Sequence, residues 1–350
     1  MSREGRSRTP APRIQRAHLI LKPVSVPEVG GDPAPHVVAR LRESGIECAV
    51  TYTQPGRPVG GDVRAALDAP DPPDVVIAAG GDGTHGPAAA ALIGTGVPLG
   101  LLALGTFNNL ARSLGIPRQI DAALDVIVAG LPHLIDAGRV NGRLFFEAAG
   151  AGWDATLFPL GDDLKRGRVA GLVGAARSAL GFRPGEITLV LDGTKRVTSH
   201  TPTVVVANGP YFGSSMAIAP GSRLDDEQLT VTLFEGFSRA DLLAYFAAVG
   251  EGRRRADARV VSHRAARVEI VSPTGLPVHA DGEPLGLLRT PFEVVPHAVA
   301  VLAPPDRSVQ GAARTERYVR PQPGTRDGNA RDRTTPWQRP AKSETGAKNS

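Results

Sequence analysis

The chain has 350 residues, and its 41% hydrophobic content is enough to build two domains, which excludes one long disordered polymer. Aromatic residues make up only 5%, so we expect no stacking surface for nucleic acid, despite a net charge of +5. No apolar run approaches the roughly 20 residues of a membrane-spanning helix, and the start of the chain lacks a signal-peptide stretch. The single cysteine, Cys48, cannot form an internal disulfide. We therefore expect a soluble or peripheral protein of the cytoplasm, with Cys48 as a buried apolar residue.

The two ends of the chain, residues 1–16 and 305–350, are rich in Arg, Pro, Gly, Thr and Ser. They carry too few large apolar residues to offset the entropy of ordering, so we predict that both are disordered. Between them, residues 17–137 alternate short apolar runs with helical stretches. Strands are expected at HLIL, ECAVTY, DVVIAAG and PLGLLAL, with helices near 34–44, 62–69 and 121–128. This pattern is typical of a parallel sheet covered on both faces and predicts an α/β domain.

The character changes in residues 138–304, where β-rich segments are separated by Gly, Pro and Asp-Gly turns. This pattern predicts a mostly antiparallel β domain interrupted by helices near 168–180 and 239–250. The expected strands are RLFFEAAG, EITLVLDG, TPTVVVAN, QLTVTLF, ARVEIVS, PFEVVP and AVAVLAP.

The most informative segment is DVVIAAGGDGTHGPAAAAL, in which an apolar strand runs directly into a glycine-rich turn and then a helix. Such a turn can bring backbone N–H groups close to phosphate oxygens, and the helix N-terminus behind it favours anions. Asp82 in the middle of this turn would repel a phosphate unless a divalent cation lay between them, so it suggests Mg²⁺. The Walker-type pattern GxxxxGK[ST] is absent.

A second strand, turn and helix follow in PLGLLALGTFNNLARSLGIP, where the strand ends at Gly105 and Thr106. Asn108 and Asn109 are placed to cap the short helix, and Arg112 could reach a phosphate or simply lie exposed on that helix. Two such turns at neighbouring strand ends should face one ligand crevice.

These two segments, together with VVVANGPYFGSSMAIAPGSRLDDEQL and HADGEPLG, resemble the catalytic domain of the diacylglycerol kinase family, which includes bacterial lipid kinases and sphingosine kinases. The resemblance covers about 17–303 and implies an NAD kinase-like nucleotide-binding domain followed by a β-rich lipid-kinase domain. It implies that ATP is held by Gly80, Gly81, Asp82, Gly83, Thr84 and Thr106, and by Thr51 or Thr53, of which Thr53 is preferred.

The resemblance also implies that Glu283 is the general base for the lipid hydroxyl and that Asp281 helps to organise the metal and the site. Asp226, with the backbone carbonyls of Arg223 and Gln228, matches a structural Mg²⁺ site of bacterial members. The residues alone support Glu283 only in outline, because Asp-Gly hairpin turns followed by Glu are common.

The chain departs from the usual family pattern at three places. Lys22 and Pro23 stand where an Asn-Pro usually ends the first strand, and Asn109 replaces the second residue of an Asn-Asp pair. Glu227 stands where many members have Gly. These departures bear on nucleotide and structural-metal binding more than on the reaction.

The sequence therefore predicts an ATP- and Mg²⁺-dependent lipid kinase, peripherally bound to the inner face of the membrane, with a lipid as substrate. The alternatives are an NAD kinase and a nucleotide-sensing regulator without turnover. The segment 163–182 combines basic residues with an apolar helix and could contact a membrane or pack on the core. The sequence leaves a homodimer open.

Overall fold

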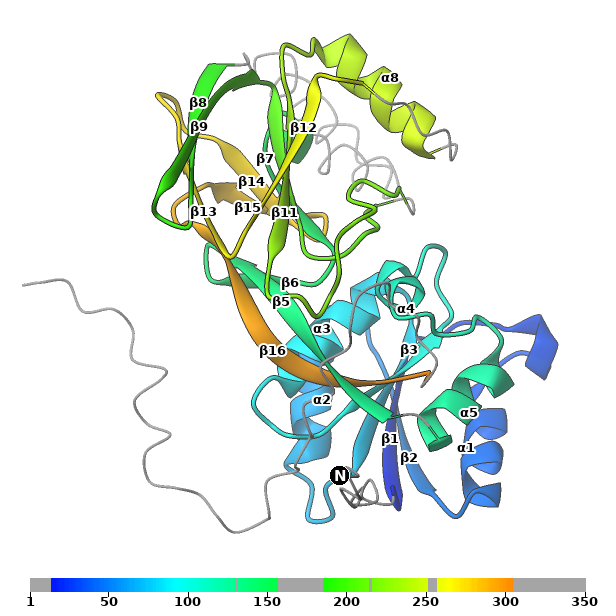
Figure 1. Ribbon diagram of the computed structural model, residues 1–350. Helices are drawn as coiled ribbons and strands as arrows, with labels where there is room; N and C mark the ends of the chain where they lie inside the picture. The colour runs from blue at the N-terminus through cyan, green and yellow to red at the C-terminus, as the bar shows by residue number, and fades with distance from the viewer. Residues whose placement is uncertain (1–13, 130, 157–184, 214–215, 251–256, 305–350) are drawn as a thin grey trace, which may run out of the picture. The chain divides into compact units, whose positions relative to one another are not determined.

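The computed structural model describes residues 14–129, 131–156, 185–213, 216–250 and 257–304. Four neighbouring strands of its first sheet are parallel and follow the order β2-β1-β3-β4 (Figure 1). β1 (Arg16–Leu21), β3 (Val75–Gly80) and β4 (Leu99–Ala103) are apolar and mostly buried, whereas β2 (Glu47–Tyr52) forms the edge. The buried strands are near-continuous apolar runs because helices cover both faces of this sheet.

Two pairs of helices cover the parallel strands (Figure 1). α1 (Ala34–Glu43) packs with α5 (Ile120–Ala129), and α2 (Val59–Leu67) packs with α3 (Asp82–Leu92). The short helix α4 (Asn109–Ser113) follows β4, and a 3-10 turn, Pro27–Val29, precedes α1. Ile77, Leu99 and Leu101 are fully buried in the core that results.

The rest of the chain is rich in strands. An all-antiparallel sheet has the order β12-β11-β10-β7-β14-β15, and β13, β8 and β9 extend the first sheet. The two sheets share an apolar core that includes Phe145 and Phe292. The bounds are β6 (Arg143–Phe145), β7 (Ala148–Gly152), β8 (Gly185–Leu191), β9 (Lys195–Thr201), β10 (Thr203–Ala207), β11 (Leu229–Phe234), α8 (Arg239–Gly250), β12 (Val260–Ala265), β13 (Arg267–Val271), β14 (Pro277–Ala280) and β15 (Glu283–Leu287), with a 3-10 turn at Asp154–Thr156.

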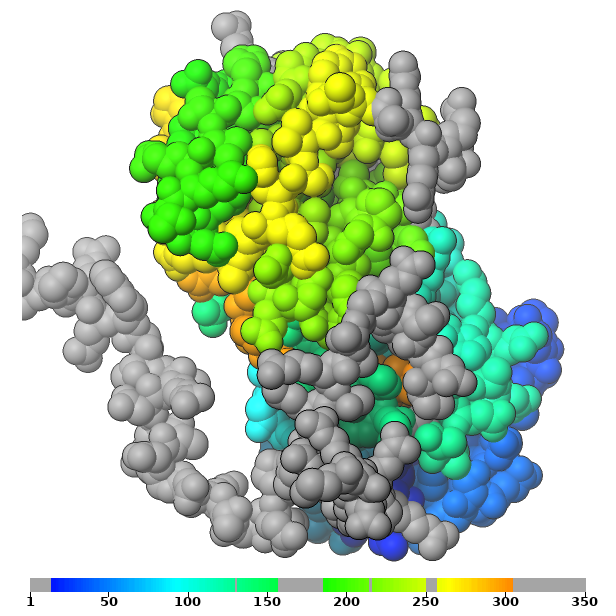
Figure 2. Space-filling view, in the orientation of Figure 1, coloured from blue at the N-terminus to red at the C-terminus, as the bar shows by residue number. Residues whose placement is uncertain are grey.

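Two long strands belong to both parts of the first sheet. β16 (Phe292–Ala303) begins beside β13 and ends parallel to β4, and β5 (Leu131–Val140) runs antiparallel to it (Figure 1). A register shift between Val295 and Val299 interrupts their pairing. The last strand within the described residues therefore returns to the sheet built by residues 16–103. In Figure 2, β8 and β9 (green) expose their outer side at the other end of this sheet.

The predicted fold class, an α/β nucleotide-binding domain followed by an antiparallel β domain, is confirmed. One strand prediction is wrong in detail: RLFFEAAG is two strands, β6 and β7, broken at Phe146 and Glu147. PFEVVP and AVAVLAP form the single strand β16. The helix expected near 168–180 lies outside the described residues, and the one near 239–250 is α8.

Candidate active site

The predicted phosphate-binding turn, Gly80–Thr84, is called the phosphate turn below. It lies at the carboxyl end of β3 in the parallel sheet. In the order β2-β1-β3-β4 the chain passes from β1 to β2 on one side of the sheet and from β3 to β4 on the other. Ligands of open α/β sheets bind at this topological switch point between β1 and β3. The carbonyl of Gly80 accepts hydrogen bonds from the N–H groups of Leu104 (2.8 Å) and Gly105 (3.0 Å). The turns after β3 and β4 are therefore joined, as expected from the sequence.

Glycine is required where these two turns meet. A Cβ on Gly105 would lie 2.4 Å from the Cα of Gly81, and a Cβ on Gly81 would lie 3.1 Å from the Cα of Gly105. Asn108 holds the second turn in place, since its side chain accepts from the N–H of Gly105 (2.9 Å) and donates to the same residue's carbonyl (2.7 Å). Asn108 has a left-handed φ of 55°. The approach of two backbones leaves no room for side chains.

The expected capping of α4 by Asn108 and Asn109 is wrong. Asn108 occupies the N-cap position, but its side chain bonds to Gly105 and makes no cap hydrogen bond. The carboxylate of Asp82, the first residue of α3, instead accepts the N–H of Leu110 at 3.3 Å. Asp82 therefore joins the start of α3 to the start of α4. Arg112 lies over the ring of Tyr211, at 3.9 Å from its centroid.

Asp281 and Gly282 form the hairpin turn between β14 and β15, with φ of 44° and 81°. The Asp281 carboxylate accepts the backbone N–H groups of Phe146 (2.8 Å), Glu147 (3.0 Å) and Ala148 (3.1 Å). Desolvation raises the pKa of Asp281 to about 6, although these three donors oppose the shift. Asp281 therefore fixes the break between β6 and β7.

Glu147, in this break, is a buried acid. Its carboxylate accepts a hydrogen bond of 2.7 Å from the side-chain amide of Asn109, and it shares a side-chain hydrogen bond with Asp82. Burial raises the pKa of Glu147 well above its usual range, and the negative charges of Asp281 and Asp82 raise it further. Residues from three distant parts of the chain thus meet at Glu147.

A cavity of about 580 Å³ brings the two predicted halves of the site together. The phosphate turn contributes Asp82 and Gly83, and the hairpin contributes Asp281 and Glu283. Glu283 is half exposed and forms an ion pair of 2.5 Å with Arg143. The other lining residues are Arg57, Pro58, Val59, Gly60, Arg64, Gly86, Pro87, Ala90, Ala91, Gly142, Leu144, Phe146, Glu147 and Ala280.

The predicted nucleotide contacts Thr51, Thr53 and Thr106 lie toward the carboxyl ends of β2 and β4 but do not line the cavity. Thr53 follows β2 and donates its N–H to Leu21 at 2.9 Å, whereas the Thr51 hydroxyl is bonded to His18 at 2.8 Å. Thr106 is exposed in the turn after β4, and Lys22 is exposed directly after β1.

The residues of the expected structural Mg²⁺ site lie together in the loop before β11, but their carboxylate is already paired. Asp226 forms an ion pair with the guanidinium of Arg264 on β12 and accepts the N–H of Gln228 at 3.2 Å. A cation would have to displace Arg264, so these residues as they stand do not fit a metal. The Arg223 side chain is bonded to Asp225 at 3.0 Å.

Glu227, in the same loop, has a left-handed φ of 57°, which explains why glycine is expected there. Asp136 accepts the N–H of Glu227 at 2.7 Å and that of His297 at 2.8 Å, and His297 also has a positive φ. One carboxylate on β5 therefore stabilises two unusual backbone conformations.

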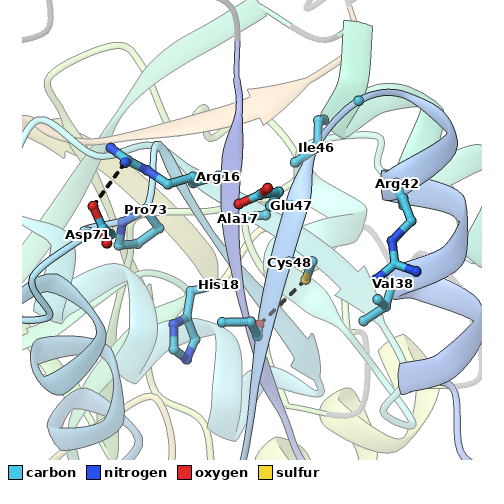
Figure 3. Close-up of a pocket in the computed structure, with 12 residues that line it drawn as sticks. Arg16, Ala17, His18, Val38, Arg42, Ile46, Glu47, Cys48, Asp71 and Pro73 are labelled. Carbon is cyan, nitrogen blue, oxygen red and sulfur yellow. Dashed lines mark hydrogen bonds and ion pairs between the residues drawn. The ribbon is translucent and has the colours of Figure 1, made fainter.

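A second cavity, of about 630 Å³, lies at the amino ends of β1 and β2 (Figure 3). Arg16 and Glu47 begin these strands, and Arg16 forms an ion pair of 3.5 Å with Asp71. The phosphate turn lies at the opposite, carboxyl ends of the parallel strands, so the second cavity is separate from the candidate site.

The fold and the cavity define an α/β nucleotide-binding protein with an antiparallel β-sandwich-like part. Residues 16–140 match the diacylglycerol kinase catalytic domain, and residues 148–303 match the YegS C-terminal NAD kinase beta sandwich-like domain. The chain belongs to the diacylglycerol kinase family, whose members include YegS-like lipid kinases. None of the helices within the described ranges has the length and apolar content to cross a bilayer.

Individual relatives agree with this family. The chain is 29% identical over 304 residues to a diacylglycerol kinase of Mycobacterium tuberculosis, covering 83% of this chain and 96% of that protein. It is 32% identical over 244 residues to a probable lipid kinase, YegS-like, of Shewanella frigidimarina, covering 66% and 77%. A diacylglycerol kinase structure from Bacillus anthracis has the same fold, with a TM-score of 0.64, 18% identity, and coverage of 84% and 99%.

The cavity fits a metal that arrives with a ligand better than one held by protein alone. Within the described residues no group of three or more His, Cys, Asp or Glu side chains is arranged to hold a metal ion. Asp82 and Glu147 nevertheless both line the cavity, and the negative charge of Asp82 contributes to the raised pKa of Glu147, so a divalent cation beside these two acids would neutralise them. Mg²⁺ commonly uses one or two carboxylates together with substrate phosphates and water.

Sequence reasoning missed Glu147 and Arg143. Glu147 is one acid inside the apolar segment RLFFEAAG, and a charge at such a place is a signal that could have identified it. Arg143, at the start of the same segment, could be assigned only after the hairpin of Glu283 was seen beside it.

Proposed function

We propose that the protein transfers the γ-phosphate of ATP, with Mg²⁺, to the hydroxyl of a membrane lipid such as diacylglycerol or a sphingoid base. The observation that carries this proposal is the shared cavity, which Asp82 and Gly83 line on the side of the parallel sheet and Asp281 and Glu283 on the side of the hairpin. A nucleotide phosphate at the first pair would face a carboxylate at the second.

Phosphoryl transfer requires positioning, neutralisation of charge and a group that accepts the hydroxyl proton. Glu283 is assigned the last role because its carboxylate is half exposed at the cavity. Arg143 pairs with it, so the acceptor hydroxyl must reach a carboxylate oxygen beside this guanidinium. Asp281 is a positioning residue, since it holds the backbone of residues 146–148 against the hairpin.

The phosphates of ATP are assigned to the turn from Gly80 to Thr84. The N-terminus of α3 directs its first N–H groups and the positive end of its dipole toward this turn. Lys22, Thr53 and Thr106 are proposed as further contacts at the same edge. Bound Mg²⁺ would neutralise phosphate charge, with Asp82 as its protein ligand.

A lipid acceptor implies that the protein works at a membrane surface, and we propose a cytoplasmic, peripheral location. The basic and apolar segment that suggested membrane contact lies outside the described residues. Co-sedimentation with vesicles of anionic and of neutral lipids tests this location. Sedimentation with neither would contradict it.

The acceptor is tested by transfer of labelled γ-phosphate from ATP to a panel of lipids in mixed micelles, with NAD as a separate acceptor. A labelled lipid supports the proposal and identifies the substrate. Labelled NADP with unlabelled lipids would establish an NAD kinase instead. ATP binding without transfer to any acceptor would favour the other alternative, a nucleotide-sensing regulator without turnover.

A further inference from the structure

Glu147 is a buried acid of the candidate site that the sequence did not assign. Its main chain is fixed on both sides: its N–H donates to Asp281 at 3.0 Å, and its carbonyl accepts the N–H groups of Asn208 and Gly209, both at 2.9 Å. The side chain therefore has little freedom to leave the cavity. An ionised acid held in this way is unfavourable, and either a proton or a bound cation can neutralise it.

Its contacts direct Glu147 toward the nucleotide half of the site. Asn109 donates to its carboxylate at 2.7 Å and to the carbonyl of Gly213 at 2.9 Å, so the amide is held on both sides. Asp82, in the phosphate turn, shares a hydrogen bond with the same carboxylate. The Oδ1 atom of Asn109 is buried and has no hydrogen-bond partner within the described part of the chain. A ligand between these groups would satisfy it.

Position 109 is also where the resemblance leads one to expect an acid, and this chain has an amide there. The carboxylate is present in space all the same, on the neighbouring segment and in contact with that amide. We propose that Glu147 acts together with Asp82 on the divalent cation that accompanies ATP, in place of an acid at position 109. This inference rests on the proposed function, because it concerns the same nucleotide site.

Binding of a fluorescent ATP analogue, measured with Mg²⁺ and with EDTA, tests this role without relying on turnover. Glu147→Gln keeps the size of the side chain and its contact with Asn109 but removes the charge. We expect the Mg²⁺-dependent gain in ATP affinity to fall about tenfold or more, and the affinity in EDTA to stay unchanged. Glu186→Gln, at an exposed position on β8, is the matched control and should behave like the wild type.

The outcomes separate this inference from the proposed function. Equal Mg²⁺ dependence in Glu147→Gln and the wild type would overturn the role of Glu147 and leave the kinase proposal standing. A wild type that binds no ATP at all would refute both. If Glu147→Gln does not fold, the double variant with Asn109→Asp and Glu147→Gln is measured instead. It exchanges the acid and the amide between the two positions and so keeps one of each in contact. Retained Mg²⁺ dependence supports the inference, and loss of that dependence with ATP binding intact overturns it.

Discussion

The guanidinium of Arg143 lies 2.5 Å from the carboxylate of Glu283, and this pair joins β6 to β15 at the edge of the cavity. Both side chains are about half exposed, so the pair adds only about 0–1 kcal/mol to stability. Its importance lies in the proposed function, in which Arg143 keeps the Glu283 carboxylate at the place where an acceptor hydroxyl would arrive.

Replacing Gly105 tests the contact between the two nucleotide turns. In Gly105→Ala the new methyl group would lie 2.4 Å from the backbone of Gly81, so one of the two turns has to move. We expect a loss of about 1–3 kcal/mol in the free energy of unfolding, together with weaker ATP binding. Urea unfolding and a nucleotide titration measure the two effects.

Gly83→Ala is the matched control for this prediction, because a Cβ at Gly83 has nothing within 4 Å. Its stability should stay within about 0.5 kcal/mol of the wild type. If Gly105→Ala were as stable as Gly83→Ala, the close approach of the two turns would be wrong.

The stability of the protein should depend on pH through Asp281. Its folded pKa is about 6, above its ordinary value of 3.8, so folding favours the protonated acid. The stabilisation is complete below the ordinary value and is lost as pH rises through the folded value. The buried acid Glu147 acts in the same direction. Urea unfolding at a series of pH values measures this decrease.

Asp281→Asn removes that titration and also disturbs the three backbone donors. We expect it to be less stable than the wild type by about 1–3 kcal/mol at low pH, because buried N–H groups lose part of their acceptor. The difference between the two proteins should shrink as pH rises. A difference that widens toward neutral pH would contradict the raised pKa of Asp281.

The ion pair of Asp226 with Arg264 predicts that the fold does not need a structural cation. Without nucleotide, EDTA should leave the melting temperature of the wild type unchanged. Arg264→Met exposes the carboxylate and should make the melting temperature rise when Mg²⁺ is added. Arg40→Met, which breaks an exposed pair with Asp125, is the control and should stay insensitive to Mg²⁺. A wild type that melts earlier in EDTA would show that a cation holds this loop.

Cys48 provides a probe of unfolding. Desolvation raises the pKa of its thiol to about 11, so little thiolate is present near pH 8. We expect Ellman's reagent to react slowly with the folded protein and rapidly after unfolding in guanidinium chloride. Equal rates in the two states would contradict the partial burial of Cys48.

The α/β half of the fold could be predicted from the sequence because its signals are local. The apolar runs at β3 and β4 lead directly into glycine-rich turns, and α1, α2 and α5 lie close to the predicted helix ranges. The last strand could not be placed in this way. β16 reads as two segments around Pro296, and its pairing with β4 joins residues about two hundred positions apart, which no local pattern records.

The site residues also divide into those with a local signal in the sequence and those defined by distant contacts. The turns at Asp82 and at Asp281 were recognised from short motifs, because each motif needs only neighbouring residues. Glu147 and Arg143 were missed because their roles depend on partners elsewhere in the chain. The pairing of Asp226 with Arg264 is likewise a contact between separate strands, so the sequence could suggest a metal site without revealing the guanidinium beside it.

The central claim is that Glu283 and the phosphate turn serve one phosphoryl transfer. The most direct test is the rate of label transfer from ATP to the lipid acceptor by the wild type, by Glu283→Gln, and by Glu186→Gln as a control. We predict that Glu283→Gln loses about 10²-fold or more in kcat while ATP affinity and folding are kept, and that the control is unaffected. A Glu283→Gln protein that phosphorylates the lipid at the wild-type rate would contradict the account.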